Sequence, residues 1–92
     1  MIPRTVMILG EPFKVRRKRM KEFGICDSDA KTIWLRSGLK GDAAITTLLH
    51  ECIHAILFRS GNSFSIASEA EESIVRALEH GLHSAGYRLI EN

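Results

Sequence analysis

The sequence contains few cysteines, few aromatic residues and no long apolar run. Cys26 and Cys52 are the only cysteines among 92 residues, too few for a disulfide framework, and they indicate a reducing, cytoplasmic setting. No apolar run approaches the roughly 18 to 20 residues that span a bilayer, so no membrane partner is expected. The apolar patch near the start is interrupted by Pro3, Arg4 and Glu11 and lacks a cleavage site, which argues against secretion.

Length and composition favour one compact domain. Hydrophobic residues make up 45% of the chain and charged residues 26%, which is typical of a globular protein. A chain of 92 residues can bury one modest core, with little room for a second lobe. We therefore predict a single domain over residues 1–92.

The net charge of +2 is unevenly distributed along the chain. Residues 1–40 contain ten Lys or Arg against four Asp or Glu, whereas residues 41–92 contain three against seven. The densest basic segment, KVRRKRMK (14–21), could attract nucleic acid or an acidic protein, or form a solvated strand end. No aromatic residue interrupts this segment, which argues against a stacking surface for single strands.

The pattern of residues predicts strands in the first half and helices in the second. Short β-branched and alternating runs predict four strands, at 5–9, 13–17, 23–27 and 31–36, with the last two forming a hairpin. Asp42 is a plausible N-cap for a helix that runs to about Ser60, where Gly61 and Asn62 supply a stop. A second helix begins at Ser68, with capping-box spacing to Glu71, and ends near Gly86. This order predicts an α+β fold, a small twisted sheet of about three to four strands packed on two helices.

The first predicted helix carries the motif His50-Glu51-Cys52-Ile53-His54. Residues four apart lie on one face of a helix, so both imidazoles can approach one zinc ion. Glu51 points about 100° away from His50, where it can reach a water held by the metal and act as general base. On average residue usage, chance would produce this five-residue pattern in only about one such chain in several hundred. The alternative to a zinc site is that the two histidines lie at the border of an apolar helix and form hydrogen bonds without any metal.

Two segments together resemble a known family. TLLHECIHAIL (47–57) and EAEESIVRALEHGL (69–82) resemble small HExxH zinc metallopeptidases of phage and prophage genomes, which are gluzincin-like and distantly related to the ImmA/IrrE type. The resemblance covers about residues 23–86. It implies a minimal zincin-like fold, a second helix that brings the third zinc ligand, and a peptide or protein substrate bound beside an edge strand. That strand is predicted to be KTIWLR, which makes Trp34 a candidate substrate-binding residue.

The third zinc ligand is predicted on the second helix. No histidine follows His54 until His80, so a glutamate is the alternative. The apolar stripe of the second helix centres close to Glu71, which would point that residue into the core, whereas Glu72 lies beside the stripe. The resemblance also favours Glu72, because the spacing from Glu72 to Val75 and Leu78 is similar to that of the phage-type proteins. We predict Glu72 as the ligand, with Glu71 as the alternate.

His80, His83 and Tyr87 are further titratable residues on or after the second helix. Each could donate a hydrogen bond to a reaction intermediate, but a surface position near a helix C-terminus is the simpler interpretation.

The function predicted from these patterns is hydrolysis of a peptide bond by a zinc metallopeptidase. The alternative is a non-catalytic zinc-containing module that contacts DNA or an acidic protein through residues 14–21. A third possibility is a small regulatory subunit that acts only with a partner.

Overall fold

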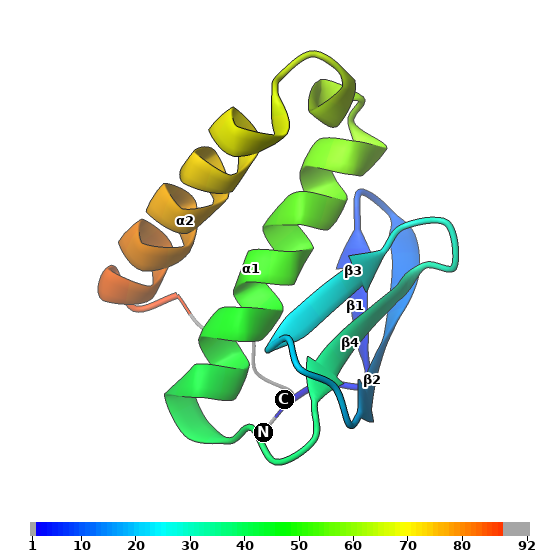
Figure 1. Ribbon diagram of the computed structural model, residues 1–92, viewed down its shortest axis with the longest axis vertical. Helices are drawn as coiled ribbons and strands as arrows, with labels where there is room; N and C mark the ends of the chain where they lie inside the picture. The colour runs from blue at the N-terminus through cyan, green and yellow to red at the C-terminus, as the bar shows by residue number, and fades with distance from the viewer. Residues whose placement is uncertain (1, 88–92) are drawn as a thin grey trace.

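A computed structural model describes residues 2–87 and has an α+β fold (Figure 1). Four strands come first: β1 (Thr5–Ile8), β2 (Glu11–Lys18), β3 (Gly24–Asp27) and β4 (Thr32–Arg36). Two helices follow, α1 (Gly41–Arg59) and α2 (Ser68–Ser84), joined through a short 3-10 turn at Asn62–Phe64. The prediction of a small sheet followed by two helices is confirmed. No helix among the described residues is long and apolar enough to cross a membrane.

The sheet has the strand order β1-β2-β4-β3. The β1–β2 and β3–β4 pairs are antiparallel hairpins, whereas β2 and β4 run parallel at its centre. The sequence did not indicate this parallel pairing, which brings together strands from the two hairpins. It also makes the prediction of KTIWLR as the edge strand wrong, because β4 lies between β2 and β3. The edge strand on this side of the sheet is β3.

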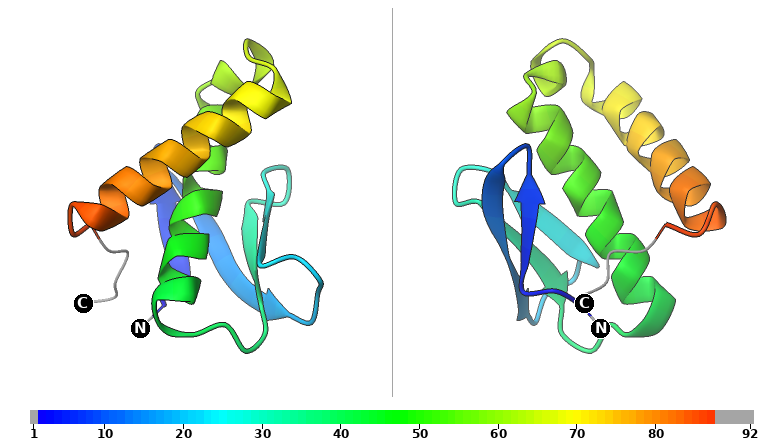
Figure 2. Two further views of the ribbon diagram at one scale, coloured as in Figure 1. Left: turned by 60° about the vertical axis from the view of Figure 1, so that its left-hand side comes forward. Right: turned by 180° about the vertical axis from the view of Figure 1, so that it is seen from behind.

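Helix α1 lies between the sheet and α2 (Figures 1 and 2). Strand alternation sends Phe13, Ile33 and Leu35 toward α1, where all three are fully buried. They meet Leu48 and other small or apolar residues of α1 to form the core. The opposite face of the sheet carries no helix in the described part of the chain (Figure 2). The single core therefore fixes α1 firmly, and α1 in turn positions α2.

The helix ends differ from the predicted caps. Lys40, rather than Asp42, is the N-cap of α1. Asp42 lies in the first turn, where its negative charge interacts favourably with the helix dipole. Gly61 follows the C-cap residue Ser60 and adopts a positive φ of 84°, as expected for a glycine that stops a helix. Ala67 is the N-cap of α2, so no capping box forms at Ser68. The carboxylate of Glu71 is consequently free for a contact with α1.

Gly24 allows β3 to approach α1 closely. A Cβ atom at this position would lie 2.7 Å from Cγ2 of Thr47 and 3.0 Å from Cγ of Glu51. Both neighbours are buried in α1, so neither can move away without disturbing the core. The first residue of the edge strand is therefore held against the middle of the HExxH helix.

We expect Gly24→Ala to destabilise the fold, whereas Gly81→Ala should stabilise it. The added methyl at Gly24 would overlap side chains of α1 and force them to move, and such overpacking of a core lowers the free energy of unfolding by about 1–3 kcal/mol. Gly81 lies within α2 with open space around it, so alanine there should add up to about 1 kcal/mol through helix propensity. Urea unfolding of both variants measures the difference. Equal stability of the two would contradict close packing at Gly24.

Candidate metal centre

The two histidines of the motif lie one turn apart on the side of α1 that faces α2. Their ring centroids are 5.0 Å apart, and about a fifth of each side chain is exposed. The core holds the neighbouring Leu48, Cys52 and Ala55 on the side of the helix that faces the sheet. The apolar residues of the motif therefore anchor α1 and leave both imidazoles at the border of the core.

Glu72 of α2 faces both imidazoles. One carboxylate oxygen lies 2.9 Å from Nε2 of His50, and the other lies 3.1 Å from Nε2 of His54. One ligand atom from each of the three residues lies within 4.8 Å of the others. Ligands around a tetrahedral zinc ion are roughly 3.3 Å apart, given bonds of about 2.0–2.1 Å. His50, His54 and Glu72 therefore form a group that can hold a metal ion.

The other nitrogen of each ring contacts a second carboxylate. Nδ1 of His50 lies 2.8 Å from Oε1 of Glu79, and Nδ1 of His54 lies 2.6 Å from Oε2 of Glu71. A ring that donates its Nδ1 proton to a carboxylate keeps a lone pair on Nε2, which is the atom that faces Glu72. In metal sites this arrangement fixes the tautomer and makes the imidazole a stronger ligand.

The charges in this cluster favour a bound cation. With neutral histidines, the carboxylates of Glu51, Glu71, Glu72 and Glu79 would bring four negative charges into one partly buried region. Two Nε2 lone pairs would then also point at the oxygens of Glu72, which is repulsive. A divalent cation between them relieves both problems, as would a proton on each ring. The donor set of the cluster thus fits a metal ion in chemistry as well as in spacing.

Glu51 is the buried carboxylate of the group. It is only 8% exposed, and its burial raises the pKa of the carboxyl, although the neighbouring His50 and His54 act in the opposite direction. Its side chain lies beside the first residue of β3, as the close approach at Gly24 requires. A carboxyl with a raised pKa accepts and returns a proton near neutral pH more readily than an ordinary glutamate.

Glu71 differs from Glu51 in its electrostatics. Burial opposes its ionisation, but hydrogen bonds from His54 and Ser63 outweigh that effect and lower the pKa of Glu71. Glu71 therefore stays ionised as the partner of Nδ1, on the side of the His54 ring away from Glu72. This placement differs from the alternate ligand role predicted for it.

Two adjoining hollows lie on either side of Glu51. One has a volume of about 570 Å³ and contains His50, Glu72 and Glu79 in its wall, together with Phe23 at the start of β3. The other, of about 320 Å³, is lined by residues of β3, α1 and α2 that include Cys26, His54, Phe58 and Glu71. The metal-binding group therefore opens into a cleft that follows the edge strand β3.

The remaining predicted site residues lie elsewhere. Trp34 belongs to β4, in register with Arg16 of β2 and Ile25 of β3, on the face of the sheet away from α1. It contributes to neither hollow beside Glu51. His80 is exposed on α2, Tyr87 is 65% exposed, and His83 lies 3.8 Å from Asp42 at the start of α1.

Glu79 was not among the site residues predicted from the sequence. This residue follows Glu72 by seven positions, two turns of α2, and Val75 lies between them on the same face. That spacing was a usable signal. The more hydrophobic Ile74 and Leu78 obscured it, because they suggested a different inward face; both are about 40% exposed.

We expect Glu79→Gln to weaken metal binding without abolishing it. The amide still accepts a hydrogen bond from Nδ1 of His50, but it no longer offers the negative charge that strengthens the imidazole as a ligand. Loss of such a partner costs typically 10- to 100-fold in metal affinity. Competition with a chromogenic zinc chelator measures the change, and Glu69→Gln, an exposed position in the first turn of α2, is the matched control. Identical affinities for the two variants would contradict a role for Glu79.

The chain matches no model of a protein family, no curated protein and no solved structure, so what this site does must be inferred from its geometry.

Proposed function

We propose that this protein is a zinc-dependent peptidase in which His50, His54 and Glu72 bind the metal and Glu51 is the general base. The observation that carries the proposal is the double contact of each imidazole. Both Nε2 atoms face Glu72, and each Nδ1 atom contacts its own carboxylate. Two satisfied histidines at a helix border would not need this convergence of three glutamates from a second helix.

Zinc is the metal that this donor set favours. Two imidazole nitrogens and one carboxylate oxygen are a common ligand set of catalytic zinc sites, which keep one position for water or substrate. Calcium and magnesium prefer shells made of oxygen atoms alone. When bound, zinc acts as a Lewis acid that lowers the pKa of water and polarises a carbonyl group.

Glu51 supplies the proton transfer in the proposed reaction. It follows His50 directly and lies in the wall of both hollows, so its carboxylate borders the space that a substrate would occupy. The carboxylate takes a proton from the attacking water and gives it to the leaving amine. Its raised pKa suits both halves of this transfer.

The substrate class is inferred from the cleft. β3 is an edge strand, and its free backbone groups can pair with an extended polypeptide. Gly24 and Cys26 share the face of β3 that is turned toward α1, next to Glu51 and His54. A peptide added beside β3 would pass from the hollow at Phe23 to the hollow at Phe58, across the metal-binding group.

The experiment that tests this proposal is cleavage of a mixed peptide library by the zinc-loaded protein, read by mass spectrometry of new termini. Cleavage should stop when zinc is removed and resume when it is restored. A protein that holds stoichiometric zinc and cleaves nothing would contradict the peptidase proposal.

A further inference from the structure

The uncovered face of the sheet has a row of cations. Lys14, Arg16 and Lys18 alternate along β2 and therefore point to the same side, with neighbours roughly 6.6 Å apart. Arg36 of β4 is in register with Lys18 and extends the row sideways, with its guanidinium 4.4 Å from the centre of the Phe23 ring and donating to the carbonyl of Lys21. Among the described residues, none of these four cations forms an ion pair with a carboxylate. The sheet thus presents unneutralised positive charge along a line.

The parallel pairing of β2 and β4 places an aromatic ring within this row. Trp34 is directly opposite Arg16, and the ammonium of Lys18 lies 4.5 Å from the centre of the indole ring. The sequence separates Trp34 from the basic segment, so the absence of an aromatic residue within residues 14–21 does not reveal that a ring lies beside that segment in the fold. In the fold, the cations and the ring form one surface.

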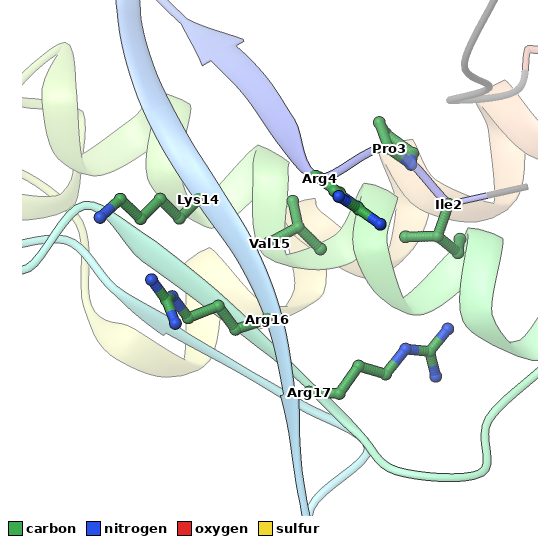
Figure 3. Close-up of a pocket in the computed structure, with 7 residues that line it drawn as sticks. All are labelled: Ile2, Pro3, Arg4, Lys14, Val15, Arg16 and Arg17. Atoms are coloured by element: carbon green, nitrogen blue, oxygen red, sulfur yellow. The ribbon is translucent and has the colours of Figure 1, made fainter.

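A groove continues this surface around the edge of β2. β1 pairs only with residues 11–14 of β2, so the part of β2 beyond Val15 has no strand beside it on that side. The groove there has a volume of about 520 Å³ and is lined by residues 2–4 and 14–17 (Figure 3). Lys14 and Arg16 point to one side of β2, whereas Arg17 points to the other, where it donates to the carbonyls of Arg36 and Leu39 (Figure 3).

We propose that this face, made of Lys14, Arg16, Lys18, Arg36 and Trp34, binds single-stranded nucleic acid. The cations neutralise the phosphates of an extended strand, and Trp34 stacks on a base, as in other sequence-tolerant single-strand surfaces. The flexible stem of Lys18 allows its ammonium to leave the ring for a phosphate. The surface lies on the opposite side of the sheet from the metal-binding group, so it is independent of the peptidase proposal.

The chemistry of the ring favours nucleic acid over two other anionic partners. The face of an aromatic ring is negative, so it repels the carboxylates of an acidic polypeptide, whereas a base stacks on it. An anionic membrane would need apolar groups that protrude into it, but Trp34 is only partly exposed and lies among longer cationic side chains. A partly exposed ring between cations is suited to a base with a phosphate on each side once the ammonium of Lys18 moves off the ring.

The test uses Trp34 as its own reporter, because it is the only tryptophan in the chain. We expect an oligothymidine of about 12 nucleotides to quench the tryptophan emission saturably, with an affinity that falls as salt rises. Removal of metal with a chelator should leave this binding unchanged. Absence of saturable quenching, or its loss on chelation, would overturn the proposal.

Variants separate the contributions of charge and stacking. Arg16→Gln/Lys18→Gln should lower the affinity at least tenfold and reduce the slope of log affinity against log salt by about 1.4, the value for two lost phosphate contacts. Arg59→Gln/Arg76→Gln removes the same charge from the helices and should change neither the affinity nor the salt slope. Trp34→Leu, measured with a labelled oligonucleotide, should lower the affinity roughly 5- to 100-fold and keep the salt slope. Equal losses of affinity in the two double variants would show that binding depends only on the overall charge of the protein, and would overturn the proposal.

Two competitors decide the class of partner. Polyglutamate and vesicles that contain an anionic lipid are titrated under the same conditions. Weaker quenching by both than by the oligonucleotide supports the proposal. Stronger quenching by polyglutamate would assign the face to an acidic protein, and stronger quenching by vesicles would assign it to a membrane; either result would overturn it.

Discussion

His54→Ala is expected to remove bound zinc from the protein. The substitution deletes one of three ligands and leaves Glu71 and Glu72 without the imidazole that each of them contacts. Elemental analysis after dialysis should give about one zinc per wild-type chain and a value near background for the variant. Zinc should also raise the melting temperature of the wild type by roughly 10 to 20 °C, because a ligand at 100 times its Kd stabilises the native state by about 2.7 kcal/mol. Zinc should leave the melting temperature of the variant unchanged.

His80→Ala is the matched control for that experiment. His80 is exposed on α2 and forms no part of the metal-binding group, so its removal should leave both the zinc content and the thermal shift unchanged. Circular dichroism establishes that both variants fold. Near-zero zinc in the wild type, or full zinc in His54→Ala, would refute the metal site proposed here.

The strands and helices were predictable because local patterns determine them. Phe13 alternates with polar residues along β2, and Ile33 and Leu35 share one face of β4 opposite Trp34 and Arg36, so both strands could be located by their buried faces. The pairing of β2 with β4 was not predictable in this way, because it joins segments about 20 residues apart and depends on how the two hairpins pack on α1. The error about the edge strand follows from this one missing contact, and so does the position of Trp34 on the face of the sheet away from the metal-binding group.

The site was predictable to the extent that it lies on one helix. The spacing of His50, Glu51 and His54 is fixed by the geometry of α1 itself. The roles of Glu71, Glu72 and Glu79 depend instead on which face of α2 meets α1. Hydrophobic patterning gave a poor answer because α2 directs carboxylates as well as Val75 toward α1 and leaves Ile74 and Leu78 half exposed. A polar site between two helices reverses the usual rule that the apolar stripe faces inward.

Glu51→Gln is expected to keep zinc and to lose hydrolysis. Glutamine has nearly the same shape as glutamate, so it should fit against Gly24 and Thr47 without disturbing the core. It also removes a buried carboxyl whose burial raises its pKa, so the variant should be at least as stable as the wild type near neutral pH. Without a carboxylate to accept the proton of water, kcat should fall by about 10²- to 10⁴-fold, the usual contribution of a general base.

Glu69→Gln is the control for this loss, because it removes one carboxylate from an exposed position of α2 and should keep full activity. The zinc content of both variants must equal that of the wild type for the comparison to report on the reaction itself. Under that condition, loss of cleavage in Glu51→Gln alone assigns the proton transfer to Glu51. Cleavage that continues at the wild-type rate would remove Glu51 from the mechanism, and zinc that leaves together with activity would show that Glu51 acts by holding the site together.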